Sequence, residues 1–93
     1  MKKKSNIQKG FNMKIYSVRD SKAKAYMRPF FVQSDEVAIR AIKQAMFDPE
    51  SEFYRFAEDY SVWYIGEFDD KTGEITPAVP EVITQVLALK EDK

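Results

Sequence analysis

The sequence of 93 residues contains neither cysteine nor histidine. Without cysteine, disulfide bonds, thiolate nucleophiles and cysteine-based zinc sites are excluded, and this composition is typical of proteins in a reducing compartment. Without histidine, the chain lacks the side chain that most readily exchanges protons at neutral pH and the commonest metal ligand. A Ser-His-Asp or Cys-His catalytic arrangement is therefore impossible. We expect no enzymatic activity, no catalytic residue, no metal and no cofactor.

Glycine, proline and long apolar runs are also scarce. Three Gly and four Pro are too few for a linker, and 44% hydrophobic with 14% aromatic residues predict a folded globular chain. No apolar run reaches the roughly 18 residues that indicate a membrane-spanning helix, so we expect no membrane partner. A chain of this length has room for one modest hydrophobic core.

Charge is balanced overall but unevenly distributed. Residues 1–33 contain nine Lys or Arg and one Asp, a net charge of +8, whereas residues 34–93 contain six Lys or Arg and fourteen Asp or Glu, a net charge of −8. The basic part indicates an anionic partner. Alternatively, the two parts neutralise each other within the fold, or pair between two copies in a homodimer. Residues 1–12 predict a flexible basic arm, and residues 13–93 a single α+β domain.

Apolar periodicity and turn residues predict the elements of the domain. Alternating β-branched and aromatic residues predict strands at 14–19, 25–33, 61–69 and 74–79. Gly73 provides the turn between the last two strands. A short helix is expected within residues 50–60. For residues 80–90, a proline at a helix start favours a closing helix, while β-branched residues leave a strand possible.

The first helix is predicted to begin after Ser34, whose side chain caps it, and to end before Pro49. Apolar residues recur at helical spacing along it. We expect three of these residues to face the sheet: Ala38, Ile42 and Ala45. We expect three polar residues to be exposed to solvent: Arg40, Lys43 and Gln44.

These elements predict an α+β fold. Two hairpins would form a four-stranded antiparallel sheet, in the order β-β-α-α-β-β-α, with the helices on one face. The other face of the sheet would then remain open.

Two groups of residues have structural explanations. The carboxylates within residues 67–74 lack the spacing of a calcium-binding loop, and a charged hairpin edge accounts for them. Trp63 and Tyr64 face opposite sides of their strand, so one belongs to the core while the other is exposed or covered by a helix. Aromatic residues of a small fold usually belong to the core.

The first hairpin combines basic and aromatic residues. Five cations are interleaved with Tyr16, Tyr26, Phe30 and Phe31: Lys14, Arg19, Lys22, Lys24 and Arg28. Nucleic-acid binding requires cations for phosphates and flat side chains for bases, and this segment contains both. Lysine is also a routine residue at turns and strand edges, so a solvated hairpin is the simpler interpretation.

The order of several short motifs resembles a known family. The segments "KIYSVRDSKAKAYMRPFF", "AIRAI" and "EDYSVWYIGEFDDKTGEI", followed by a late Pro, resemble the small non-structural DNA-binding protein of gokushoviruses, the single-stranded DNA phages of the Microviridae. The resemblance covers about residues 13–82. It rests on Tyr16, Val18, Asp20, Ala25, Tyr26, Pro29, Phe30, Ala38, Arg40, Glu58, Asp59, Tyr60, Gly66, Phe68, Asp69 and Gly73.

The resemblance implies a phage non-structural protein that acts during genome replication and packaging. Its site of action would be the cytoplasm of the bacterial host, and it would not be a virion component. Related members are implicated in the switch from making duplex DNA to packaging single strands into procapsids. The resemblance implies DNA as the partner, and the family has no catalytic motif to carry over.

We therefore predict DNA binding, to single strands rather than duplex and largely independent of sequence. The predicted phosphate contacts are Lys14, Arg19, Lys22, Lys24 and Arg28, supplemented by Lys2, Lys3, Lys4 and Lys9. Tyr26 and Trp63 are the predicted stacking residues, and Arg40 extends the basic surface or pairs with Glu36. The alternative is a protein-interaction module that contacts the replication initiator or a procapsid protein without binding DNA directly.

Overall fold

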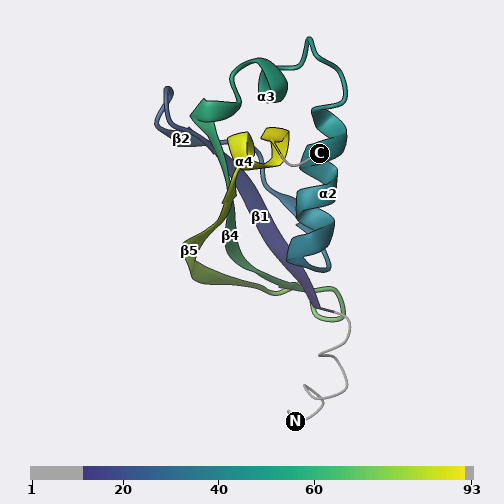
Figure 1. Ribbon diagram of the computed structural model, residues 1–93. Coiled ribbons are helices and arrows are strands. Elements are labelled where there is room, and N and C mark those ends of the chain that lie inside the picture. Colours follow the sequence, from purple (N-terminus) through teal and green to yellow (C-terminus); the bar gives the residue numbers. More distant parts are fainter. Residues whose placement is uncertain (1–11, 92–93) are drawn as a thin grey trace.

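The computed structural model describes residues 12–91 of the chain. They adopt an α+β fold with one antiparallel sheet, in which the strand order is β2-β1-β4-β5 and β3 also pairs with β1 (Figure 1). The strands are β1 (Asn12–Asp20), β2 (Ala25–Tyr26), β3 (Phe30–Val32), β4 (Tyr60–Asp69) and β5 (Ile75–Gln85). The helices are α2 (Asp35–Ala45), α3 (Glu52–Arg55), the 3₁₀ helix η2 (Ala57–Asp59) and α4 (Val86–Glu91). Of the predicted arm, Asn12 begins β1 and the other residues lie outside the described part.

The second predicted strand, 25–33, is two short strands in the structure. Arg19 pairs with Tyr26, and Tyr16 pairs with Phe30. The segment therefore advances four residues while β1 advances three, so it contains one extra residue. Pro29, between the two strands, has no N–H to donate to the ladder. The prediction of four strands was therefore wrong, and within residues 12–91 the sheet has five.

The last strand is longer than predicted. β5 continues through Pro77 and Pro80 as far as Gln85. It lies at the edge of the sheet and pairs with β4, and an edge strand tolerates proline because one side of its backbone makes no ladder hydrogen bonds. For residues 80–90, the sequence left a helix and a strand as alternatives. The strand is correct as far as Gln85, and the short helix α4 follows it.

Helix α2 buries a narrower stripe than predicted. Ser34 caps the helix by accepting a hydrogen bond from the Val37 N–H at 3.3 Å. Ala38 and Ile42 are buried as expected, but Ala45 is exposed and Met46 is buried in its place. The buried residues Ala38, Ile42 and Met46 are spaced by four, and each such step advances about 40° around the helix. The buried stripe therefore winds around α2 toward Met46, and Ala45 lies outside it.

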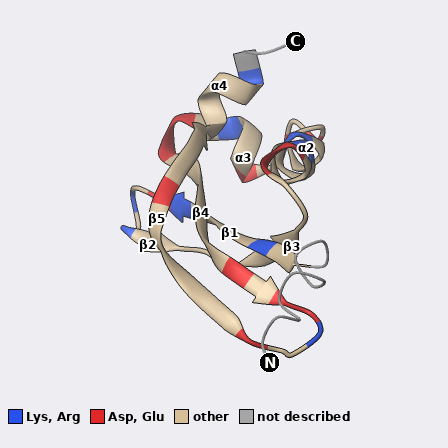
Figure 2. Cartoon of the chain, turned by 90° about the horizontal axis from the view of Figure 1, so that it is seen from below, with Lys and Arg blue, Asp and Glu red and all other residues tan. Residues whose placement is uncertain are grey.

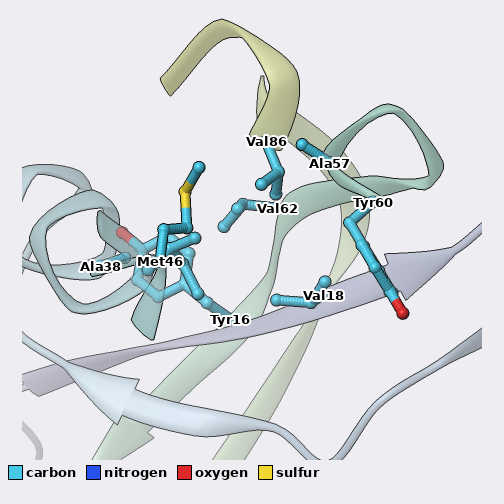
Figure 3. Close-up of a cluster of buried hydrophobic side chains, with 9 residues drawn as sticks. Tyr16, Val18, Ala38, Met46, Ala57, Tyr60, Val62 and Val86 are labelled. Carbon is cyan, nitrogen blue, oxygen red and sulfur yellow. The ribbon is translucent and has the colours of Figure 1, made fainter. Parts of the chain in front are cut away.

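The hydrophobic core lies between one face of the sheet and the helices. Tyr16, Val18 and Val62 contribute from the strands, and helices α2 and α4 pack over them (Figure 3). Phe53 of α3 contacts Tyr60 edge-to-face, with ring centroids 5.0 Å apart. The three helices therefore gather on the same side of the sheet (Figures 1 and 2). Among residues 12–91, no helix is long and apolar enough to cross a membrane.

Gly66 marks a close approach between β4 and β5. A Cβ at this position would lie 2.7 Å from the Thr76 carbonyl oxygen, which is a backbone atom. We expect Gly66→Ala to lower the free energy of unfolding by about 1–3 kcal/mol, because the two strands must separate. Urea denaturation checks this, with Gly73→Asn as the control.

The control is informative because Gly73 also has a special conformation but no close neighbour. Its φ is +82°, and a Cβ there would meet no atom within 4 Å. Asparagine tolerates this region of φ better than most residues. If Gly66→Ala were no less stable than Gly73→Asn, the close approach would not constrain residue 66.

Candidate nucleic-acid interface

The pairing of the strands assigns side chains to the two faces of the sheet. Residues directly opposite each other on neighbouring strands share a face. Tyr16 lies opposite Tyr64 and Val18 opposite Val62, on the face that the helices cover. We call the other side the aromatic face. Its members on the first four strands are Met13, Ile15, Ser17, Arg19, Tyr26, Phe31, Ser61, Trp63, Gly66 and Phe68.

The predicted stacking residues, Tyr26 and Trp63, meet on the aromatic face. Their ring centroids lie 5.9 Å apart at an interplanar angle of 78°. The Trp63 Nε1–H donates to the Ser61 Oγ at 2.8 Å, which holds the indole ring in place. Tyr26 is 45% exposed, and the guanidinium of Arg19 lies 5.9 Å from its ring centroid. A cation and two aromatic rings therefore form one partly exposed group.

Acidic side chains of the strands lie on the opposite face. Glu67 pairs with Lys14, Asp69 with Asn12, and Glu81 with Tyr64, all on the side of the helices. Among the residues assigned to the aromatic face, Arg19 is the charged one. Figure 2 also places basic residues at the β1–β2 turn and mainly acidic residues at the β4–β5 turn, at the other end of the sheet. The aromatic face is thus suited to an anionic, base-bearing ligand.

The β1–β2 turn holds its cations on a defined backbone. The Asp20 carboxylate accepts the Lys22 N–H at 2.9 Å, and the Asp20 carbonyl accepts the Lys24 N–H at 2.8 Å. The Ser21 N–H donates to the Asp59 carbonyl at 2.9 Å, which connects the turn to η2. Lys24 has a φ of +58°, in the left-handed region. Lys22 and Lys24 are exposed in the turn that directly precedes β2, the strand that carries Tyr26.

Arg28 lies near this group but at the edge of the sheet. It is exposed, and it lines a groove of about 440 Å³ on the helix side, together with apolar residues. The segment that carries it is anchored to β1, because the Met27 N–H donates to the Val18 carbonyl and the Ser17 Oγ donates to the Met27 carbonyl at 2.6 Å. The position of Arg28 is therefore fixed beside β1, and the groove that it lines opens on the helix side.

Two predicted contacts are not part of the group. The Lys14 Nζ lies 5.7 Å from the Tyr64 ring centroid, and Lys14 lines a small pocket with Asp35 and Glu81. Arg40 is exposed on α2, on the helix side. Both remain predicted contacts, but neither adjoins the aromatic face. The lysines at positions 2, 3, 4 and 9 lie outside the described residues.

The chain matches one known protein family over most of its length. The model of the family described as "Phage ORF5 protein" matches residues 13–89. The chain belongs to this family. Protein ORF5 of Chlamydia phage 1 is 32% identical over 81 residues, which cover 83% of this chain and 84% of that protein. No solved structure matches the chain.

The segment shared with the phage ORF5 family contains the aromatic face and the basic turn. Arg19, Lys22, Lys24, Tyr26 and Trp63 all lie within residues 13–89. The resemblance expected from the sequence, to a small phage protein of this kind, is thus confirmed. Residues 1–12 precede the matched segment.

Three tyrosines of this ORF5 family member are structural donors on the helix side. Each donates its hydroxyl to a carboxylate: Tyr16 to Asp35, Tyr60 to Glu52 at 3.1 Å, and Tyr64 to Glu67 at 3.2 Å. Burial, followed by the bonded carboxylate, raises the pKa of Tyr60 to about 12 and raises the pKa of Tyr16 and Tyr64 as well. All three hydroxyls therefore stay protonated at neutral pH and hold helices and strands in place.

Sequence reasoning missed a second aromatic pair on the same face. Phe31 and Phe68 lie edge-to-face, with ring centroids 5.5 Å apart at 81°. Simple alternation along β4 would place Phe68 on the face opposite Trp63. Ile15 of β1 pairs with Gly66, but the next residue, Tyr16, pairs with Tyr64. Ile65 is therefore an extra residue in β4, a β-bulge. This bulge returns Phe68 to the aromatic face. The local signal that could have indicated it is Gly66, because a glycine within a strand often marks a bulge.

Proposed function

We propose that this phage ORF5 family member binds single-stranded DNA, largely without regard to sequence, during genome replication and packaging. In this proposal Tyr26 and Trp63 stack on bases while Arg19, Lys22, Lys24 and Arg28 contact phosphates. The role is one of binding without catalysis, metal or cofactor, and its place is the cytoplasm of the bacterial host rather than the virion. Arg40 and Lys14 would contribute through long-range attraction.

The observation that supports the proposal most strongly is the Arg19–Tyr26–Trp63 group. Aromatic rings and a guanidinium are the side chains on which unpaired bases stack, and they tolerate any base because every base has a flat π face. The group lies on a face whose assigned positions include no acid, beside the basic β1–β2 turn. Single strands are favoured because duplex DNA keeps its bases stacked inside the helix.

The alternative is a protein-interaction module, and exposed apolar residues of β5 favour it. Ile75 is 60% exposed and Val79 is 87% exposed. Such residues at a sheet edge could meet a replication initiator, a procapsid protein or a second copy. A gel shift with a single-stranded oligonucleotide, at two salt concentrations and against a duplex control, separates the two proposals. Absence of a shift at low salt would favour the interaction module.

Replacing Tyr26 provides a residue-level test of stacking. We expect Tyr26→Ala to weaken single-strand binding by about 1–3 kcal/mol without changing its dependence on salt, because stacking is uncharged. Fluorescence anisotropy with a labelled oligothymidylate at several salt concentrations measures both quantities.

The matched control is Tyr54→Ala. Tyr54 is 38% exposed, similar to Tyr26, and its ring also lies near a cation, the Lys90 Nζ at 4.3 Å, but on the helix side. We expect this variant to bind like the wild type. Equal effects of the two substitutions would remove Tyr26 from the interface.

A further inference from the structure

We propose that Phe31 and Phe68 form a second base-stacking subsite, which together with the Tyr26–Trp63 pair gives the interface a defined length. This inference rests on the proposed function, since both subsites would hold the same DNA strand. Phe31 comes from the basic hairpin but was not among the predicted contacts, and the bulge at Ile65 brings Phe68 onto the face.

The second pair has the same construction as the first. In each pair, a ring of β4 (Trp63 or Phe68) makes edge-to-face contact with a ring from the strand on the other side of β1 (Tyr26 of β2 or Phe31 of β3). Phe31 is 41% exposed and Tyr26 is 45% exposed. Ile15, which pairs with Phe31, is buried at 5% exposure. The rings therefore rest on a closed apolar floor with part of their surface in solvent.

The two pairs are separated along β1 by a distance that suits a nucleic-acid strand. Trp63 lies opposite Ser17 and Phe68 lies opposite Met13, four residues away. At about 3.3 Å per residue, the separation is about 13 Å. A stacked strand rises about 3.4 Å per nucleotide, so the two subsites would lie about four nucleotide steps apart, or fewer in an extended strand.

Charge on this part of the face favours a base over an acidic protein partner or a bare phosphate. Glu67 and Asp69 flank Phe68 in sequence but lie on the helix side, where Glu67 accepts the Tyr64 hydroxyl. The Asp69 carboxylate accepts the Lys71 N–H at 2.9 Å. The mainly acidic β4–β5 turn lies at this end of the sheet, but the positions of the aromatic face next to the Phe31–Phe68 pair are apolar, with Met13 and Ile75 opposite Phe68 and Ile15 opposite Phe31. We expect the pair to contribute stacking without adding to the salt dependence.

The test uses Trp63, the single tryptophan of the chain, as a reporter of the first subsite. Tryptophan fluorescence is titrated with a thymidine dinucleotide, which can fill one subsite, and with an octamer, which can span both. For Phe31→Ala we expect the octamer to quench Trp63 to the same extent at saturation, but with an affinity about 5- to 150-fold lower than wild type. The dinucleotide should lose no more than about twofold, since one subsite stays intact.

Two further variants keep the test decisive. Phe31→Leu retains apolar bulk but not a flat ring, so it should fold like the wild type and still lose octamer affinity. Phe56→Ala removes a phenylalanine of matched exposure, 42%, on the helix side, and should bind both oligonucleotides normally. Thermal unfolding followed by circular dichroism verifies that each variant is folded.

The failures of the two proposals give different results. If the folded Phe31 variants bind the octamer as tightly as wild type does, there is no second subsite. In that case the octamer still quenches Trp63, because it still binds the first subsite. If they instead convert a wild-type dimer into monomers in sedimentation experiments, with octamer binding unchanged, this end of the face is a contact between two copies. If the octamer neither binds nor quenches the wild type, the proposed function itself is wrong.

Discussion

Replacing Lys22, Lys24 and Arg28 together by Gln is expected to reduce the salt dependence of single-strand binding substantially. Each neutralised phosphate contributes about −0.7 to the slope of log affinity against log salt, so losing three contacts reduces the slope by roughly 2. Between about 200 mM and about 50 mM salt, wild-type affinity should therefore rise about 20-fold more than that of the variant. Anisotropy titrations at four or five salt concentrations give the slope.

The substitution should leave the fold intact. All three residues are exposed, and exposed charges away from special contacts usually change stability by no more than about 0.5 kcal/mol. The backbone of the turn is held by Asp20 and by the Ser21–Asp59 hydrogen bond, neither of which is altered. A lower slope in a folded variant therefore reports on lost contacts with DNA.

A matched variant replaces three other basic residues with Gln. Lys43, Arg55 and Lys90 lie on α2, α3 and α4, on the other side of the sheet. Lys43 and Lys90 are half-buried and the Lys90 Nζ donates to the Tyr54 carbonyl at 3.0 Å, so circular dichroism first verifies that this variant is folded. The change in net charge is the same, so a general electrostatic effect would act equally in both variants. If the hairpin variant retains the affinity and slope of the wild type, the hairpin is a solvated edge and the interaction module becomes the better explanation.

The second large effect concerns the core. Ile42→Ala should lower the free energy of unfolding by about 2–5 kcal/mol, the usual range for emptying a buried aliphatic site. Ile42 is 5% exposed and packs in the cluster that contains Tyr16 and Val18. Urea denaturation followed by circular dichroism measures the change.

Val37→Ala on the same helix is the control. Val37 is 36% exposed, so its truncation should change stability by no more than about 0.5 kcal/mol. Single-strand affinity of the folded Ile42 variant should equal that of the wild type, because Ile42 faces away from the aromatic face. A loss below about half a kilocalorie for Ile42→Ala would mean that α2 buries a different stripe.

Much of the local structure could be predicted because its causes lie within a few residues. The hydroxyl of Ser34 caps α2, and Gly73 takes the positive φ that its hairpin requires. Alternation along a strand places Tyr16 and Val18 on one side of β1 and Ile15, Ser17 and Arg19 on the other, and the structure has this arrangement. The same rule puts Lys14 on the Tyr16 side, and the structure indeed places it there, away from the other predicted contacts.

Other features depend on which strand lies next to which. The last strand was expected to end at residue 79, before Pro80, but β5 is an edge strand and continues through Pro77 and Pro80 to Gln85. Pro29, by contrast, interrupts pairing along β1 and divides the second strand into two. Ala45 was expected in the core, and the stripe of α2 that packs on the sheet excludes it. Sequence patterns describe one element at a time, whereas these outcomes depend on its neighbours.

The candidate interface divides in the same way. The sequence by itself determined the basic hairpin and selected Tyr26 and Trp63, because cations and aromatic rings can be recognised by type and spacing. Only the tertiary structure decided that Tyr26 and Trp63 touch, since they come from strands far apart in the chain. It also decided that Phe68 shares their face, because the bulge at Ile65 reverses the alternation of β4. Gly66 indicates that a bulge can form in β4, because a glycine within a strand often marks one, but the pairing with β1 decides that Ile65 is the extra residue.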